Sequence, residues 1–264
     1  MANRMLGSTT QAPAQPVSAQ PVLAPAIEHD AGSGLPEEGG AGSPTRHRHR
    51  ERSEHALIRT LTYVVLASWL ALVVAFGAGR AFVRPAGMPP YPIAVGVAAP
   101  LVMFFAAFWL SSAFRNFVMA ADLRLVTIIQ GWRWAGFGFL ALYAYGVLPG
   151  RFAWLAGLGD MAIGLTAPWM ALALIRRPGF ARTRPFVVWN LLGILDLVAA
   201  VGNAAIIQTL ATGAAGEVTV APMALMPLVL VPAYLVPLFI ILHVVGLLQA
   251  KRLNDRVGSS PAGR

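Results

Sequence analysis

The sequence contains no cysteine, only one lysine, and few charged residues of any kind. Charged side chains make up 12% of the 264 residues and apolar ones 57%, a composition typical of membrane proteins rather than soluble globules. The absence of cysteine excludes disulfides, thiolate metal ligands and thiol nucleophiles. The net charge is +9 and is carried almost entirely by arginine. In so apolar a chain, excess arginine indicates membrane topology and lipid-headgroup contact rather than nucleic-acid binding.

Motifs of known enzymes are also missing. The sequence holds no H-E-x-x-H, G-x-S-x-G or Walker pattern, and Gly157-Leu158-Gly159 lies inside an apolar stretch without the strand–turn–helix context of a dinucleotide site. We therefore expect no enzymatic activity and no cofactor. His47, His49 and His55 could bind a metal, but their flexible, arginine-rich surroundings favour a solvated segment that contacts headgroups, so we expect no metal site.

Both ends of the chain differ in composition from its centre. Residues 1–56 are rich in Ala, Pro, Gly, Gln and Ser and show no apolar periodicity, which predicts a disordered cytoplasmic tail. The early basic region and apolar stretch of a secretory signal peptide are not evident there. Residues 251–264 are expected to form a short basic cytoplasmic tail.

Residues 57–250 carry long apolar stretches that predict an all-α, polytopic membrane bundle of six transmembrane helices. Each stretch is close to the roughly 20 residues that a helix needs to cross the hydrocarbon layer. The predicted spans are 57–79, 92–112, 131–148, 152–175, 186–209 and 227–249. Residues 113–129 are too charged to span, and their helical apolar stripe predicts a helix that either lies in the interface or extends the adjoining spans.

Charge asymmetry orients this bundle. With the N-terminus inside, fourteen Lys and Arg residues fall at the cytoplasmic ends of the spans, whereas only Arg80, Arg84 and Arg151 fall on the other side. This positive-inside pattern predicts that both termini are cytoplasmic. Tryptophans near span ends are expected to belong to the aromatic belt at the interface; they are Trp154, Trp169 and Trp189.

Two aspartates lie within the predicted spans. A carboxylate in hydrocarbon costs at least ~2.5–3.5 kcal/mol on insertion scales, so Asp160 and Asp196 must be partnered, hydrated or protonated. Each follows a glycine in the pattern G-x-x-D and lies on a stripe of small residues, which predicts that both face other helices. Because the two spans run in opposite directions, the repeated pattern could be the trace of an inverted repeat.

Counting residues along each span gives the expected depths. Asp160 should share a layer with Asn203 in the outer half, with Asp196 deeper, near the middle. Together with polar residues nearer the inner ends, they define a candidate intramembrane polar or transport site; its members are Asp160, Asp196, Asn190, Asn203, His243 and Arg133. Arg133 could pair with a carboxylate or reach the inner headgroups, and His243 could form a structural hydrogen bond or relay protons.

Prolines recur every five residues in the last span and the segment before it. Each removes a backbone hydrogen bond, so the outer half of that span is expected to be bent or partly unwound. In transporters, broken helices expose carbonyls to ions or substrate, whereas in most membrane helices prolines only bend the helix. The candidate helix break or gate consists of Pro227, Pro232 and Pro237.

Three stretches resemble a family of small, uncharacterised bacterial multi-pass membrane proteins. They are LPGRFAWLAGLGDMAIGLTAP at 148–168, WNLLGILDL at 189–197 and APMALMPLVLVPAYLVPLFIILH at 221–243. The resemblance covers most of residues 90–250 and implies a membrane bundle of about six helices. It transfers no catalytic residue to this chain.

Two functions fit these features. The first is a non-catalytic membrane assembly or regulatory protein whose buried polar residues join helices. The alternative is a small proton- or ion-coupled secondary transporter that uses Asp160 and Asp196. The expected partners are the lipid bilayer and a second copy of the chain or another membrane protein, with no nucleic acid.

Overall fold

The computed structural model describes residues 44–258, and every regular element in that range is helical. Six helices are long and apolar enough to cross a membrane, as predicted. They are Ala56–Ala78, Tyr91–Leu110, Leu123–Ala144, Gly150–Arg176, Arg184–Leu210 and Val231–Asp255. The predicted disordered tail lies largely outside the described residues. Within its last part, α1 (Pro44–Ala78) already begins at Pro44, consistent with a proline in the first turn followed by good helix formers such as Arg and Glu.

The charged segment after the second span is divided between two helices. α2 (Tyr91–Leu110) is followed by the short helix α3 (Ser112–Met119) and then by α4 (Leu123–Ile129). The Asp122 side chain accepts a hydrogen bond from the Arg124 amide at 2.8 Å and so begins α4. The third span therefore starts at Leu123 rather than near residue 131, because the Asp122 cap and an apolar stripe extend the helix at its N-terminal end.

The third span is not one continuous α-helix. It passes from α4 into the 3₁₀-helix η1 (Gln130–Gly136) and then into α5 (Phe137–Ala144). A 3₁₀ segment is slimmer than an α-helix, and a stretch of it within a span often marks a functional or strained position. The segment contains Arg133, so the irregular backbone coincides with the most polar side chain of this span.

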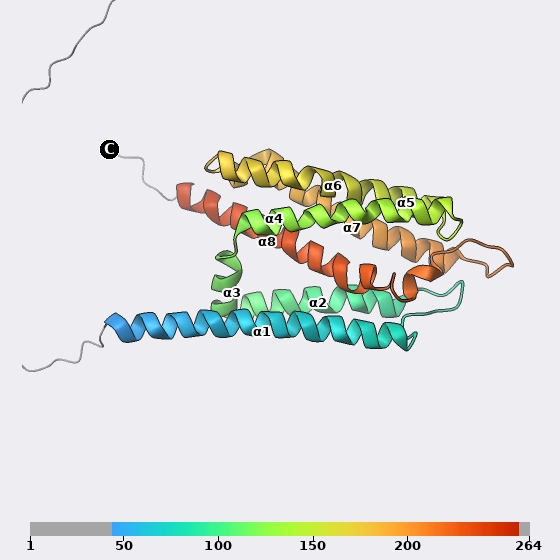
Figure 1. Cartoon of the computed structure of the whole chain (residues 1–264), viewed down its shortest axis with the longest axis horizontal. Coiled ribbons are helices and arrows are strands. Elements are labelled where there is room, and N and C mark those ends of the chain that lie inside the picture. Colours follow the sequence, from blue (N-terminus) through green and yellow to red (C-terminus); the bar gives the residue numbers. More distant parts are fainter. Residues whose placement is uncertain (1–43, 259–264) are drawn as a thin grey trace, which may run out of the picture. The chain divides into compact units, whose positions relative to one another are not determined.

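The fourth and fifth spans are regular. α6 (Gly150–Arg176) and α7 (Arg184–Leu210) are joined through the 3₁₀ turn η2 (Phe180–Arg182) and pack against each other. In Figure 1, α4, α5, α6 and α7 lie together on one side of α8, while α1 and α2 lie on the other. α8 (Val236–Gly258) is thus the central helix, and its span is the most buried of the six.

The sixth span is preceded by irregular backbone. The 3₁₀ turn η3 (Ala221–Ala224), a turn around Pro227 and the π-helix η4 (Val231–Leu235) come before α8. Regular α-helix therefore begins only at Val236, because Pro227, Pro232 and Pro237 each remove a backbone donor. The span begins at Val231 rather than Pro227 and continues to Asp255.

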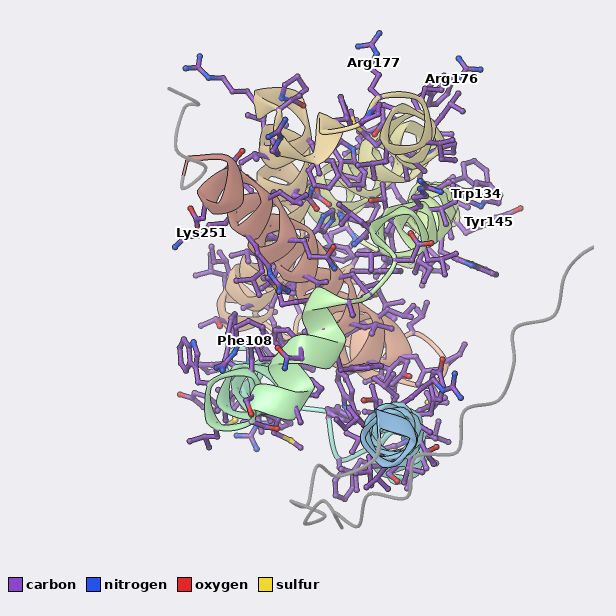
Figure 2. The ribbon with its side chains drawn as sticks, turned by 90° about the vertical axis from the view of Figure 1, so that its left-hand side faces the viewer. Phe108, Trp134, Tyr145, Arg176, Arg177 and Lys251 are labelled. Atoms are coloured by element: carbon purple, nitrogen blue, oxygen red, sulfur yellow. The ribbon has the colours of Figure 1, made fainter. Side chains whose placement is uncertain are left out.

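One end of the bundle is rich in arginine. Described cations there are Arg59, Arg115, Arg124, Arg176, Arg177, Arg182, Arg184, Lys251 and Arg252. We call it the arginine-rich end, and Figure 2 looks onto it, with Arg176, Arg177 and Lys251 at its periphery. The opposite end consists of the loops 79–90, 145–149 and 211–230.

The long loop of the opposite end is closed by a local carboxylate. Glu217 accepts hydrogen bonds from the Thr212 hydroxyl at 2.9 Å and from the amides of Thr212 and Gly213 at 2.9 and 2.8 Å. These donors hold the pKa of the exposed Glu217 carboxyl below its ordinary value, the Thr212 hydroxyl contributing most. These hydrogen bonds fix the turn from Thr212 to Glu217, shortly before η3 begins at Ala221.

Candidate functional site

Arg133 is the centre of the candidate site. It lies in η1, halfway along the third span, and only 2% of its surface is exposed. A guanidinium cannot be left unpaired in hydrocarbon, so its position depends on acceptors supplied by neighbouring helices.

The guanidinium contacts three other helices. Its Nε donates to Asp160 Oδ1 on α6 at 2.7 Å, and one terminal nitrogen donates to Asp196 Oδ2 on α7. The other terminal nitrogen lies 3.3 Å from the Gly193 carbonyl oxygen and 3.0 Å from His243 Nε2 on α8. One side chain therefore joins the third, fourth, fifth and sixth spans.

These contacts define the hydrogen-bonding state of His243. Arginine is a donor only, so the fully buried His243 must accept from Arg133 through an unprotonated Nε2. Its Nδ1 then carries the proton and donates to Asn190 Oδ1 at 3.0 Å. The Asn190 amide nitrogen donates in turn to the Phe186 carbonyl oxygen at 2.9 Å. His243 is thus neutral in this arrangement, and a protonated ring would lose its contact with Arg133.

The charges of this network do not cancel. Asp160 and Asp196 bring two carboxylates to one guanidinium, and no other ion pair occurs among residues 56–255. With His243 neutral, two ionised carboxylates would leave one negative charge in excess. Arg133, Asp160 and Asp196 are called the charged triad below.

Glycines allow the helices to approach closely enough for these contacts. A Cβ on Gly164 of α6 would lie 2.1 Å from the Trp134 amide nitrogen, and one on Gly193 would lie 2.1 Å from His243 Nε2. A Cβ on Gly159 would lie 1.6 Å from Asp196 Oδ1. Such distances are far inside van der Waals contact. At Gly164 the obstacle is backbone, so a larger residue would force the helices apart, whereas at Gly159 and Gly193 it would displace the Asp196 or His243 side chain from the network.

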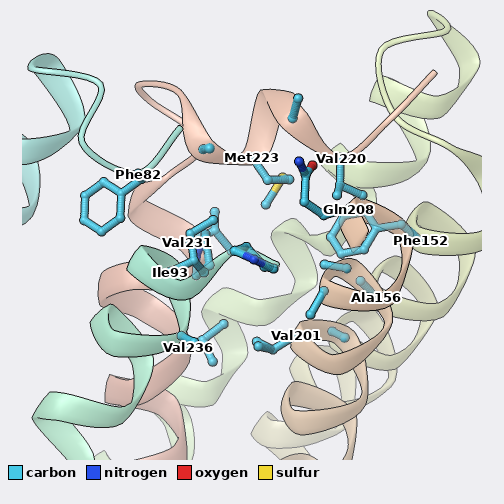
Figure 3. A pocket seen from close by; sticks show the side chains of 18 of the residues that line it. Phe82, Ile93, Phe152, Ala156, Val201, Gln208, Val220, Met223, Val231 and Val236 are labelled. Carbon is cyan, nitrogen blue, oxygen red and sulfur yellow. The ribbon is translucent and has the colours of Figure 1, made fainter. Parts of the chain in front are cut away.

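A cavity of about 90 Å³ extends from the opposite end of the bundle toward the charged triad. Asp160 belongs to its lining and Asp196 does not. Most of the lining is apolar, as Figure 3 shows for Phe82, Val201 and Val236. The volume is enough for roughly three water molecules, at about 30 Å³ each in the liquid. Asp160 thus connects the buried charges to a space that a small molecule could enter.

The structure brings five of the six predicted site residues together. Arg133, Asp160, Asp196, Asn190 and His243 form one hydrogen-bonded network. Asn203 lies outside it, and its amide nitrogen donates to the Arg151 carbonyl oxygen at 2.9 Å.

The expected depths were wrong for the two aspartates. They do not occupy separate layers, because both carboxylates bind the same guanidinium. Counting residues assumes straight parallel helices and ignores the reach of arginine.

Trp189 was also misassigned to the interfacial belt. It is 5% exposed, its indole nitrogen donates to Thr166 Oγ1 at 2.8 Å, and its ring lies edge-on to His243 with centroids 5.3 Å apart. Trp154 and Trp169 are exposed on the surface, as a belt position requires. Trp189 lies four residues before Gly193 and seven before Asp196, so helical spacing places it on the face of α7 that is directed into the bundle.

Of the prolines, Pro232 lies in η4 and lines the cavity, whereas Pro237 is fully buried at the start of α8. Gln130 was missed altogether. It is 1% exposed, its amide nitrogen donates to the Phe239 carbonyl oxygen at 3.1 Å, and its Oε1 has no partner among the described residues. Its position three residues before Arg133, on the same helical face, is the signal that could have found it.

The six apolar helices and the buried charged triad define a multi-pass membrane protein. The comparison with family models specifies it further, since a domain of unknown function, DUF8737, matches residues 90–250. The match covers more than half of the chain, so the protein belongs to this family. No curated protein and no solved structure matches the chain. The matched range begins at the second span and includes every residue of the network.

Removing the Arg133 charge should strongly destabilise the bundle. Arg133→Gln leaves two neighbouring carboxylates without a cation, and breaking a buried pair in this way typically costs about 3–5 kcal/mol. Arg124→Gln, an exposed position in the same span, should change stability by at most about 1 kcal/mol. Reversible unfolding of the two variants in mixed micelles measures the difference. Equal stabilities would contradict the central role of Arg133.

Gly164→Ala should also destabilise the protein, by about 1–3 kcal/mol or more, because its Cβ would collide with the backbone of η1. Gly202→Ala provides the matched control, since a Cβ on Gly202 of α7 meets nothing within 4 Å. That variant should gain up to about 1 kcal/mol from helix propensity. The same unfolding measurement tests both, and a neutral Gly164→Ala would show that the helices are not in close contact there.

Proposed function

We propose that the protein is a small ion-coupled carrier for a solute that enters the cavity, with the charged triad as its coupling centre. The observation that carries this proposal is the position of Asp160, which lines the cavity and also binds Arg133. An ionisable group that faces both a cavity and a buried charge network is a typical coupling position in membrane transport.

Charge balance supplies the coupling. The charged triad has one carboxylate more than it has guanidinium groups. The low dielectric of the membrane penalises this excess charge, so one proton or one monovalent cation should accompany the triad. A solute that enters beside Asp160 changes the surroundings of that carboxylate. Solute loading and proton occupancy are therefore linked through Asp160.

The irregular backbone before α8 supplies a movable wall. Pro232 and Val231 of η4 line the cavity, and Val236 at the first turn of α8 does as well. A π-helix interrupted by proline has fewer regular hydrogen bonds to break than an α-helix, so it can change conformation at lower cost. Of the predicted gate residues, Pro227 and Pro232 belong to this segment, and Pro237 lies directly after it in the first turn of α8.

The arginine distribution supports an orientation for the carrier. In a bacterial inner membrane, the arginine-rich end would face the cytoplasm, with both termini inside. The cavity would then open toward the outside. The proposal requires no cofactor and no catalytic step.

The second candidate is a non-catalytic assembly or regulatory protein, in which the network only fixes how the helices pack. The close approach at Gly164, Gly159 and Gly193 favours it, because such packing resists movement of the helices that surround Arg133. The two candidates differ in whether the cavity becomes accessible from both sides of the membrane.

Thiol labelling can separate them, since the natural chain has no cysteine. Ala200→Cys places a thiol in the cavity lining, and Val198→Cys places one two residues away on the same helix, where 55% of the side chain is exposed outside the cavity. Thiols react as thiolates and so require water. A membrane-impermeant thiol reagent should modify Ala200→Cys and leave Val198→Cys unmodified.

The experiment is completed with two preparations, right-side-out and inside-out vesicles, in which the reagent reaches opposite ends of the bundle. A carrier should expose Ala200→Cys to reagent added on either side, with the faster rate at the opposite end of the bundle. Labelling from one side alone would support the structural candidate, and no labelling at all would show that the cavity is closed to water.

Proton exchange at the charged triad is tested separately. Infrared spectra recorded across a pH titration should contain the carbonyl band of a protonated carboxyl, and this band should disappear in Asp160→Asn. Asp255→Asn, which removes an exposed carboxylate near the end of α8, should retain it. Identical titrations of wild type and Asp160→Asn would remove Asp160 from the coupling mechanism.

A further inference from the structure

The cavity has a different chemical character at each end. Asp160 lies at the inner end, well inside α6, whereas Arg84 and Gln208 line the part near the loops of the opposite end. Gln208 lies two residues before the end of α7, and its amide nitrogen donates to the carbonyl oxygens of Arg84 and Pro85 at 3.4 and 3.1 Å. Between these polar groups the lining is apolar, as Figure 3 shows from Gln208 and Val220 to Val201 and Val236.

Arg84 has no anionic partner among the described residues. Its only side-chain contact of hydrogen-bonding type there is from a terminal nitrogen to Met88 Sδ at 3.6 Å, and its Nε is buried without an acceptor. The two ion pairs of the described bundle both belong to Arg133. A partly buried guanidinium beside apolar side chains favours a charged acceptor, because such hydrogen bonds are about twice as strong as neutral ones.

We infer that the cavity binds a short single-chain amphiphile with an anionic headgroup, such as a carboxylate or phosphate. The cavity volume of about 90 Å³ limits the chain to a few carbons. The headgroup lies against Arg84 beside Gln208, at the level where the spans end. The chain extends along the apolar lining toward Asp160. This polarity matches a molecule that enters from the lipid–water interface with its chain directed into the membrane.

Other ligand classes fit the lining less well. A cationic amphiphile would place its charge beside Arg84, and a small polar anion would leave the apolar walls without a partner. An uncharged chain gains little, since the surrounding lipid is as apolar as the cavity. Preference over bulk lipid must therefore come from the headgroup, which makes Arg84 the residue that determines specificity.

This inference names the substrate class of the proposed carrier and in that sense rests on it. Binding itself can be measured without transport. Butyl phosphate serves as the probe, with butanol and butylamine as neutral and cationic chains of equal length. Equilibrium binding to the full-length protein in phosphatidylcholine nanodiscs, with empty nanodiscs subtracted, gives the affinities.

Butyl phosphate should bind more tightly than either analogue. Arg84→Gln should weaken its binding about tenfold or more, which corresponds to the loss of a charge-assisted hydrogen bond. Arg84→Lys should restore part of the affinity and also shows that the loop folds. Arg151→Gln removes an arginine at the same end but outside the cavity, and should leave affinity within about twofold. Equal binding of butanol, or tighter binding of butylamine, would overturn the inference.

Two further measurements distinguish the cavity from the protein surface. Ala200→Leu should fill the apolar part of the cavity and weaken binding, and butyl phosphate should protect Ala200→Cys from the thiol reagent. If Arg84→Gln weakens binding but neither of these effects appears, the amphiphile lies on the surface and the inference is wrong.

The failures of the two proposals can be told apart. Cavity binding with one-sided thiol labelling would retain the amphiphile site and reject the carrier. Two-sided labelling without butyl phosphate binding would retain the carrier and reject this substrate class.

Discussion

The desolvated guanidinium of Arg133 is the interaction on which the rest of the bundle depends. Placing it in mid-membrane is tolerable only if acceptors reach it from several directions, and here they come from α6, α7 and α8. That requirement explains the glycines on the facing helices and the slim 3₁₀ backbone that carries the arginine. It also explains why the sixth span lies at the centre, since His243 must reach the same nitrogen as the Gly193 carbonyl.

The same interaction limits which residues can handle protons. His243 accepts from Arg133 and donates to Asn190, so both ring nitrogens are occupied and the ring cannot gain a proton without losing a contact. The carboxylates are less constrained, because Arg133 occupies only one oxygen of each in the network. Asp160 combines this freedom with a place in the cavity lining. Proton exchange at Asp160 is therefore compatible with an intact network, whereas exchange at His243 requires it to open.

Much of the fold followed from hydropathy, but the site followed only in part. The six spans are long enough for composition to identify them, and the glycine stripes correctly indicated that Asp160 and Asp196 face the bundle. The sequence left open whether Arg133 pairs with a carboxylate or reaches the headgroups. That it binds both aspartates could not be inferred, because Arg133 lies in a 3₁₀ segment whose rise differs from that of an α-helix. The cavity depends on loops from residues 82–84 and 220–224, whose positions no helical period describes. Trp189 was misassigned because a tryptophan near the end of a span is compatible with either an interfacial or a buried position.

The repeated G-x-x-D pattern now has a local physical cause. Gly157 precedes Asp160 by one turn and lies against Gly136 and Leu140 of the third span, and Gly193 precedes Asp196 by one turn and lies against His243 of α8. Gly157 lets the third span, which carries Arg133, approach Asp160, and Gly193 lets α8, which carries His243, approach Asp196. The binding of both carboxylates to Arg133 is therefore enough to produce the pattern. An inverted repeat would also require a counterpart of the proline-interrupted segment before α8. In the described part of the chain, π-helix occurs only at η4, on the cavity side of Arg133. Movement of η4, the wall of the cavity, therefore has no symmetric equivalent toward the arginine-rich end. Access of a solute from that end would have to come from rearrangement of the charged triad itself.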